Sequence, residues 1–527
     1  MGNFRELLKY RILGGDSTLE NHLTTTHSKA TYISPVVQNE LIDCCKQIIT
    51  QQILHEVKES KYYSILFDET TDMSHVSQMS LILRYVKKVD SNEHNIQDTT
   101  PKTVIEPKLT GEILGNTVLK VLKHFSLDPQ YCVGVGTDGC SVMVSSIKGA
   151  IKTIQSVAKN AARCSCANHA LNLAISKSST VQSIRNSVGL VKEIVSFFNM
   201  SAKRNFVLKS VLNGKPHLKS LCETRWTDRH DSIAIFKCSM SDIIEALTNI
   251  SEWNELDSSS KAKTLLTAMC TCEFIISINA LSNILSVTAP ISRILQGIDN
   301  DVLAAFECIK NVVTILENMR TNCDTVFKQI FEEICSLMKN FEIEVKTPRL
   351  SKRQTQRSNH PSENTEDFYR SQLIPKFIVD VNDEKIDSIV SIMKNGYKFD
   401  DDLLELLEES QLKSEIQLWK EKWKTIKNES GEVIKDALTA IDQCSGILYP
   451  NIKKMLYIIA CLPITVASAE RSFSTLRRLK TWLRSNMGQD RLVGLALLNI
   501  HRNRDIKIDE VIDMFAATKK RNIDLII

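Results

Sequence analysis

The chain has 527 residues, too many for one simple hydrophobic core and suited to two or three domains. Its 66 Lys and Arg residues nearly balance its 62 Asp and Glu residues, and the net charge of +4 excludes overall charge as an argument for nucleic-acid binding. The 15 scattered cysteines, a start without an apolar signal core and the lack of an obvious run of about 18 apolar residues lead us to expect an intracellular, mainly helical chain with reduced thiols and no membrane span.

The first predicted elements are one helix and three strands. Residues 1–34 are polar and weakly patterned, whereas apolar residues recur on one face of a helix over 35–60. Short runs rich in β-branched and aromatic residues predict strands at 62–72 and 78–88, and a weaker one at 103–109. The turn-prone stretches between these strands favour an antiparallel meander.

From residue 110 the apolar period becomes helical. A strand is then predicted at 131–139, a helix at 141–159, a strand at 163–166 and a helix at 167–178. The order is three strands, helix, strand, helix, strand. It predicts an α/β fold with a mixed sheet, in which the meander is followed by crossover units.

Beyond about residue 185 the chain is predicted to be almost entirely helical, apart from a polar, disordered loop at about 346–366. We therefore predict an N-terminal helical segment, the first part of an α/β core, a helical insertion domain, and a C-terminal region that returns to the core: 1–60, 61–184, 185–445 and 446–527.

Three acids stand where a metal site needs them. Asp68 ends the first strand, Asp138 ends the fourth, and Glu470 lies in the first turn of a later helix. Each has a simpler explanation: a turn for Asp68, a turn or helix cap for Asp138, and the helix dipole for Glu470. Together, two strand-end aspartates and a helical glutamate offer the oxygen ligands that two Mg²⁺ or Mn²⁺ ions need for phosphoryl transfer.

The helix with Glu470 is predicted to begin after Pro463 with Thr465 or Ser468 as its cap, and to end at Gly488. A second helix follows, with Asp490 as its cap. The first helix carries an apolar stripe of Phe473, Leu476, Leu479 and Leu483. Such stripes can close the core or join two chains; we expect the first role near the acid and the second in the helix after Gly488.

Basic and aromatic residues offer candidate DNA contacts. Arg471, Arg477 and Arg478 follow the acid, and they could track a phosphate backbone or form the solvated face of an amphipathic helix. Trp226 beside Arg225 could stack on a flipped base and hold its phosphate, or be a core tryptophan with solvated neighbours.

Cys166 and His169 form a CxxH motif. A structural zinc site needs four ligands, and no second pair lies at matching spacing. The alternatives are a buried histidine with satisfied hydrogen bonds and a pair of residues that lines a DNA site.

Several of these segments together resemble the hAT superfamily of DNA transposases, and most closely its element-derived zinc-finger MYM-type and protein kinase inhibitor repressor-like group. They are ILFDETTD, GVGTDGCSVM, CSCANHALNLA, ETRWTDR, the polar loop RQTQRSNHPSE and SAERSFSTLRRLKTWLRSNMGQDRLVGLALLNI. The resemblance covers nearly the whole chain, and its last segment matches the hAT C-terminal dimerisation region.

The resemblance implies an RNase H-like mixed-sheet core interrupted by a large all-helical insertion domain. It places Asp68, Asp138 and Glu470 at the positions of a DDE triad, which cleaves and transfers DNA strands with Mg²⁺ or Mn²⁺. It also implies DNA as a partner, a homodimer or higher homo-oligomer formed by the C-terminal region, a nuclear location and no membrane association.

The resemblance gives roles to the remaining candidates as well. Trp226 matches a tryptophan that helps the family's DNA hairpin step, and Cys166 and His169 match its CxxH. Relatives also carry an N-terminal zinc finger, whereas only the adjacent Cys44 and Cys45 precede the first acid here. We therefore expect no structural zinc in this chain.

Three hypotheses follow. The intact set of acids favours a transposase-like enzyme. The missing finger favours a domesticated, non-catalytic DNA- or chromatin-associated regulator that acts through dimerisation. A purely structural helical scaffold would require the three acids to lie far apart.

Overall fold

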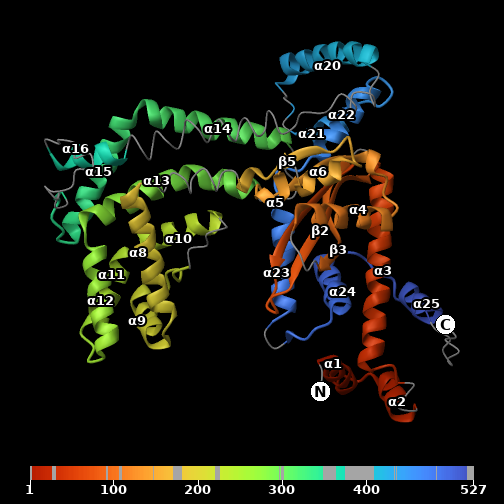
Figure 1. Cartoon of the computed structure of the whole chain (residues 1–527), viewed down its shortest axis with the longest axis horizontal. Helices are drawn as coiled ribbons and strands as arrows, with labels where there is room; N and C mark the ends of the chain where they lie inside the picture. The colour runs from red at the N-terminus through yellow and green to blue at the C-terminus, as the bar shows by residue number, and fades with distance from the viewer. Residues whose placement is uncertain are drawn as a thin grey trace. The chain divides into compact units, whose positions relative to one another are not determined.

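The computed structural model describes residues 3–26, 31–90, 93–105, 110–145, 148–169, 181–219, 226–295, 297, 302–347, 364–373, 409–431, 434, 436–481 and 484–518 (Figure 1). The chain divides into two compact units. Unit 1 comprises residues 1–161, 460–462 and 466–527, and unit 2 comprises residues 162–459 and 463–465. The four predicted domain ranges stay a prediction.

A five-stranded mixed sheet has the strand order β3-β2-β1-β4-β5. The strands are β1 (Tyr63–Thr71), β2 (Ser77–Asp90), β3 (Glu93–Ile105), β4 (Cys132–Thr137) and β5 (Ala162–Ser165). β2 runs antiparallel to both β1 and β3, whereas β4 runs parallel to β1. The predicted meander followed by a crossover is therefore confirmed.

The third strand is longer than the sequence pattern predicts. It begins at Glu93 rather than near residue 103, and it pairs with β2 from Asp90↔Glu93 to Gln78↔Ile105. β3 lies at one edge of the sheet, so its residues EHNIQDTT can be polar without forming an apolar run. An apolar-run criterion therefore misses the first half of this strand.

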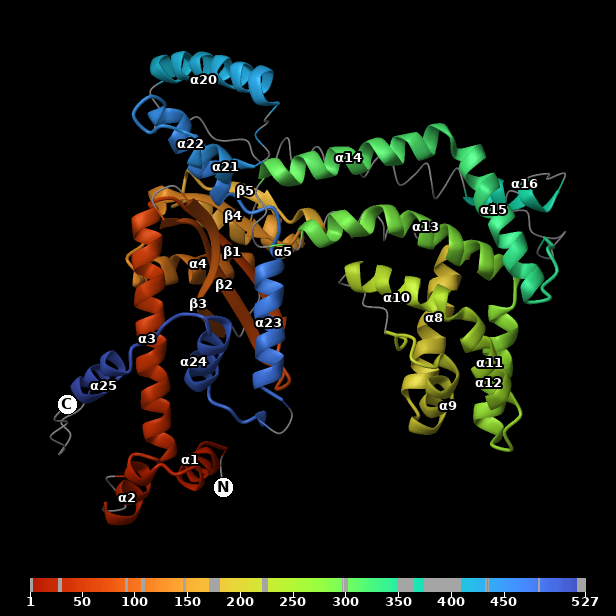
Figure 2. The same cartoon turned by 180° about the vertical axis from the view of Figure 1, so that it is seen from behind.

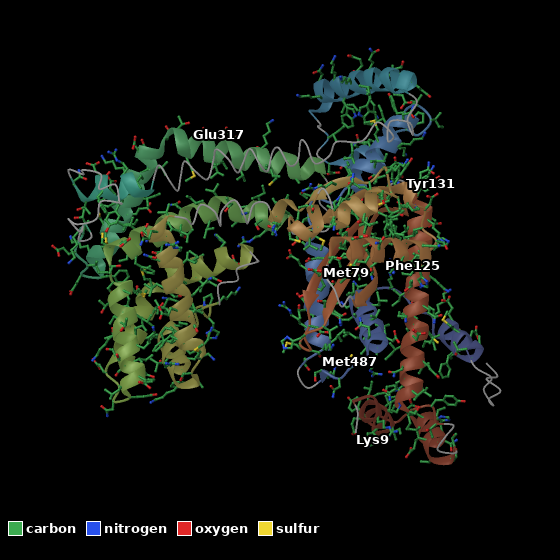
Figure 3. The ribbon with its side chains drawn as sticks, viewed as in Figure 1. Lys9, Met79, Phe125, Tyr131, Glu317 and Met487 are labelled. Carbon is green, nitrogen blue, oxygen red and sulfur yellow. The ribbon has the colours of Figure 1, made fainter. Side chains whose placement is uncertain are left out.

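The two faces of the sheet in unit 1 are covered by different helices (Figures 1 and 2). Residues Tyr63, Ile65 and Phe67 of β1 join one core with α3 (Pro35–Ser60), α4 (Gly111–His124) and α6 (Ala150–Gln155). Figure 3 labels Met79 and Phe125, two buried members of this core. The alternate residue Leu66 points to the other face, as the two-residue period of a strand requires.

That other face is covered by α23 (Ala467–Leu479), against which α24 (Gln489–Ile500) packs. α24 also lies against α3 at Gly494, where an added Cβ would stand 2.4 Å from Cγ2 of Ile42. A larger residue at Gly494 would therefore force the Ile42 side chain to shift.

Some elements in unit 1 differ from those predicted. Residues 1–34, where the weak pattern predicts no individual element, contain two helices, α1 (Asn3–Leu13) and α2 (Ser17–Thr25). The helix predicted at 141–159 is two short ones, α5 (Ser141–Val144) and α6, because Gly149 forms the extended cap of α6. The helix predicted at 167–178 lies largely outside the described residues.

Unit 2 is helical apart from β5, in the residues that the structure describes, which confirms the helical pattern predicted beyond residue 185. Its helices are α8 (Gln182–Asn199), α9 (Ala202–Leu212), α10 (Trp226–Cys238), α11 (Met240–Ser251), α12 (Leu256–Met269), α13 (Cys272–Leu295), α14 (Val302–Thr321), α15 (Cys323–Asn340), α16 (Thr365–Leu373), α20 (Glu409–Ser430), α21 (Ala437–Asp442) and α22 (Pro450–Cys461). Most of the predicted disordered loop lies outside the described residues.

Helix α13 corrects one expectation. By length and composition it could cross a membrane, contrary to the expectation that the chain has no such segment. Ser and Asn residues interrupt its apolar sequence, so it contains no unbroken apolar run. The buried share of its most apolar window is 72%, and residues such as Ile275 and Leu285 belong to the core of unit 2. This burial is what a core helix shows.

A carboxylate cluster on the sheet as candidate metal and DNA site

The parallel pairing of β1 with β4 brings two of the predicted acids to neighbouring positions. The last paired residues are Leu66 and Gly136. Asp68 lies two residues beyond this pair on the Leu66 face, inside β1, which continues to Thr71, whereas Asp138 directly follows the end of β4. The prediction that Asp68 ends its strand is therefore wrong.

Helix α23 brings Glu470 to the same face. Ala469 packs against Leu66 of β1 and Ile82 of β2. One turn further along, Ser472 Oγ donates a hydrogen bond of 2.6 Å to Ser80 Oγ, and Ser80 is the partner of Asp68 in the antiparallel pairing. Glu470 lies between these two contacts in the chain, in the first turn of the helix.

The electrostatics of Asp68 reflect this gathering of charges. Burial is the largest effect, and together with the negative charges of Asp138 and Glu470 it raises the pKa of Asp68 to about 7. The backbone N–H of Glu69 donates to Asp68 Oδ1 at 2.8 Å and opposes the shift only in part. Asp68 therefore lies within electrostatic range of both other acids, which argues against the purely structural scaffold.

A further acid that the sequence analysis did not single out, Glu69, follows Asp68 in β1 and belongs to the opposite face of the strand, that of Phe67. Burial and then the charge of Asp138 raise its pKa. Its Oε2 is buried and has no hydrogen-bond partner in the described part of the chain. The only sequence signal was its place as the second acid in FDETTD.

The donor chemistry of these residues fits a hard divalent cation. Carboxylate oxygens are the ligands that Mg²⁺ and Mn²⁺ take. Among the described residues, however, no group of three or more His, Cys, Asp or Glu side chains is placed so that it could hold a metal ion. The acids supply the donors, and side-chain rotation would have to bring them together.

A buried polar network fixes the first turn of α23. Arg84 and Asp98, whose side chains are only 2% and 4% exposed, form an ion pair at 3.3 Å across β2 and β3. Ser468 Oγ donates to Asp98 Oδ2 at 2.5 Å and accepts a hydrogen bond of 2.8 Å from Arg471 Nη2. Ser468 therefore joins the helix to the sheet. The predicted caps are wrong, because Val466 is the N-cap and provides no side-chain hydrogen bond.

A second buried contact fixes the other end of α23. Lys480 Nζ lies 2.6 Å from Asp72 Oδ2, and both side chains are 7% exposed. Burial alone would raise the pKa of Asp72, but the hydrogen bonds from Lys480 and from the backbone of Val76 and Ser74 outweigh it and lower that pKa. The helix consequently ends at Leu479, earlier than predicted.

The helix after Gly488 also differs from expectation. Gly488 is its N-cap, and Asp490 lies in its first turn instead. Its apolar side is buried within unit 1, and Leu492 and Ala496 pack against α23. The monomer therefore already covers this apolar side, and the expectation that the helix joins two chains stays a prediction. Leu483 lies outside the described residues.

The candidate DNA-binding residues fall into two groups. On α23, the side chains of Arg471, Arg477 and Arg478 are exposed, and Arg478 Nη2 donates to Thr475 Oγ1 at 3.1 Å. In unit 2, Trp226 is the first residue of α10. The Trp226 side chain and all of Arg225 lie outside the described residues.

Cys166 and His169 follow β5 in unit 2. Cys166 is buried, and its Sγ lies 3.7 Å from Thr465 Oγ1, to which it donates. The backbone N–H of His169 donates to Cys166 Sγ at 3.4 Å, as at the start of a helix. The motif thus has a local structural role, and its DNA role stays a prediction.

Two family models match the chain. Residues 1–149 match the ZMYM1/FAM200 RNase-like domain, and residues 408–504 match the hAT family C-terminal dimerisation region. The chain is therefore similar to an RNase-like domain in its first segment, which holds most of the mixed sheet, and to a hAT dimerisation region in its last segment. The resemblance noted from the sequence motifs is confirmed.

Two relatives extend the similarity over nearly the whole chain. The chain is 26% identical to the human (Homo sapiens) 52 kDa repressor of the inhibitor of the protein kinase, over 99% of its own length and 73% of that protein. It is also 26% identical to the mouse (Mus musculus) protein of the same name, over 96% of its own length and 70% of that protein.

Proposed function

We propose that this hAT-related protein acts on DNA as a homodimer in the nucleus, through an RNase H-like core interrupted by the helical region. Asp68, Asp138 and Glu470 would hold Mg²⁺ or Mn²⁺ for DNA strand cleavage and transfer. The observation that carries the proposal is the convergence of acids from β1, β4 and α23 on one face of the sheet.

The chain's own residues would prepare this chemistry. Bound cations would supply charge stabilisation at the attacking and leaving oxygens of a phosphodiester. Asp68, with a pKa of about 7, exists in both protonation states near neutral pH and would release its proton when it binds a cation. The Ser468–Asp98 hydrogen bond and the Lys480–Asp72 ion pair, at the two ends of α23, would hold Glu470 over the sheet.

The remaining candidate residues would bind DNA. Arg471, Arg477 and Arg478 form the exposed basic side of α23, which suits contact with phosphates. Trp226 would stack on a base beside Arg225, and Cys166 with His169 would line the DNA path.

Cleavage can be tested on supercoiled DNA with the purified chain and Mn²⁺ or Mg²⁺. We expect nicking that falls by at least about a hundredfold in Glu470→Gln, because a metal ligand is lost. Asp490→Asn is the matched control, since this exposed acid belongs to the first turn of α24. A folded wild-type chain that nicks no DNA with either metal would refute retained catalysis.

A second function has one specific observation in its favour: both relatives are named repressors. In this role the chain would act as a non-catalytic DNA- or chromatin-associated regulator, and the acids would be inherited features. Expression profiles of cells that carry Glu470→Gln decide between the two functions. Unchanged profiles favour the regulator, and profiles that match a deletion favour the enzyme.

A further inference from the structure

Helix α9 carries an aromatic side chain on its exposed side. Phe206 is 72% exposed, whereas Leu208 and Leu212 of the same helix are buried in the core of unit 2. Lys203 and Lys209, three residues before and after the phenylalanine, are exposed as well, so the three side chains share one face of the helix. The exposed side of a helix that packs on a core normally carries polar residues, and Phe206 contributes nothing to that core.

The segment that contains this helix is basic. Between Glu193 and Glu223 the sequence has no Asp or Glu, but it has five Lys and Arg residues: Lys203, Arg204, Lys209, Lys215 and Lys219. The overall charge of the chain is close to neutral, so this segment concentrates positive charge in one place. A local cluster of cations is the feature that attracts phosphates to a protein surface.

Two acids from other parts of unit 2 compensate some of this charge. Glu255 Oε2 lies 3.7 Å from Lys203 Nζ, and Asp242 Oδ2 lies 2.7 Å from Lys215 Nζ. The other three cations of the segment form no ion pair with any residue that the structure describes. The surface therefore keeps three cations that can pair with an anionic ligand.

The loop after α9 extends the basic surface. Asn213 and Gly214 end the helix with positive φ angles of 43° and 86°, and the chain turns there. Leu218 is buried in the core of unit 2, whereas its neighbours His217 and Lys219 are exposed. The loop is therefore attached to the same core as α9, which holds Lys219 at the protein surface.

The basic surface precedes the Trp226 motif in the chain. Trp226 begins α10 seven residues after Lys219. The two Cα atoms are therefore at most about 25 Å apart, because an extended chain spans at most about 3.6 Å per residue. A DNA strand of about eight nucleotides, at about 3.4 Å per phosphate, covers this distance. A strand held at Trp226 can thus reach the basic surface.

We infer that the exposed face of α9 and the loop that follows it bind single-stranded DNA. Phe206 stacks on an unpaired base, and Arg204, Lys209 and Lys219 bind the neighbouring phosphates. This inference rests on the DNA-directed function proposed above and gives its substrate a second contact surface. The occupant is a single strand, because the bases of a duplex stack on each other and leave no base face open to Phe206.

The test is DNA binding by the full chain, measured as the fluorescence anisotropy of a labelled strand of about 20 nucleotides and of its duplex. EDTA in the buffer prevents cleavage. In Phe206→Ala we expect the dissociation constant for the single strand to rise about tenfold, because one base loses its stacking partner, and the constant for the duplex to stay unchanged. In Lys209→Gln we expect the slope of log affinity against log salt concentration to fall by about 0.7 for the single strand, because one phosphate contact is lost.

Two control variants make the same chemical changes elsewhere. Tyr10→Ala removes an aromatic ring that is 73% exposed on α1, and Lys328→Gln removes an exposed cation on α15. Both should bind the strand like the wild type. Phe206 and Lys209 are exposed, so their substitution should leave the fold intact, which circular dichroism checks. Photo-crosslinking of a thiothymidine strand to the wild-type chain adds a readout that needs no variant, and the crosslinked peptides should cover α9.

Each outcome decides for or against this surface. Wild-type affinity in both variants, or crosslinks that all lie outside α9 and its loop, refutes the surface. An equal loss of single-strand and duplex affinity in Phe206→Ala refutes the single strand as the occupant. A wild-type chain that binds no strand at about 100 µM also refutes the surface. The nicking assay is independent: strand binding without nicking refutes only the proposed catalysis, and nicking without strand binding refutes only this surface.

Discussion

The partly buried carboxylate of Asp68 makes a quantitative prediction about stability. Its pKa in the folded chain is about 7, against an ordinary value of 3.8. Ionising it in place therefore costs about 4 kcal/mol, at 1.36 kcal/mol for each pKa unit. Asp68→Asn removes this cost and leaves an oxygen that can accept the N–H of Glu69.

The sign of the effect follows from proton linkage. The folded state holds the Asp68 proton more tightly than the unfolded state, so the wild type loses stability between about pH 4 and pH 7. The variant has no such loss. Asp68→Asn should therefore match the wild type near pH 4 and exceed its unfolding free energy by about 4 kcal/mol at pH 8.

The assay has to report on the sheet of unit 1. Hydrogen exchange of the peptide that covers β1, measured over a urea series in a chelating buffer, gives its opening free energy. A difference between variant and wild type that stays constant from pH 5 to pH 8 would refute the reasoning, because the carboxylate would then not be buried among like charges.

Three further perturbations test the contacts around the sheet. Glu56 has a pKa lowered to about 2, because hydrogen bonds from two cations and a tyrosine outweigh its burial. Glu56→Gln should therefore lower the unfolding free energy by about 3 kcal/mol at pH 7, and by less as the pH falls below 4.5. The same exchange assay measures this loss. Lys480→Ala leaves Asp72 buried without its cation and should cost about 3 kcal/mol in urea unfolding, whereas the double variant with Asp72→Ala should recover part of the loss. Gly494→Ala places a methyl group against Ile42 and should cost about 1–3 kcal/mol, which Ile42→Ala relieves if the clash is the cause.

Some of the fold follows from local sequence. The apolar runs of β1, β2 and β4 and the helical period of α3 predict these elements nearly to the residue, since each lies in a core that demands such side chains. β3 escapes the same reasoning because an edge strand is held by backbone hydrogen bonds and tolerates polar residues.

The candidate site shows a similar division. Asp68, Asp138 and Glu470 were singled out from their places at strand and helix ends and from their motifs. Glu69 was missed, because the sequence FDETTD does not show that a carboxylate oxygen of its second acid is buried. The partners that hold α23 were missed as well. Ser468 and Asp98 are 370 residues apart, and Lys480 and Asp72 are 408 apart.

The sequence by itself determined the mixed order of strands and helices, the similarity to hAT-related proteins and the chemical character of the three acids. These depend on periods and motifs that span a few dozen residues. Only the tertiary structure decided that the acids of β1, β4 and α23 share one face, that α24 is buried within its own unit, and that Phe206 lies on the exposed side of α9. The reason is physical: a local pattern shows that a face is apolar, but the packing of distant segments decides what covers it.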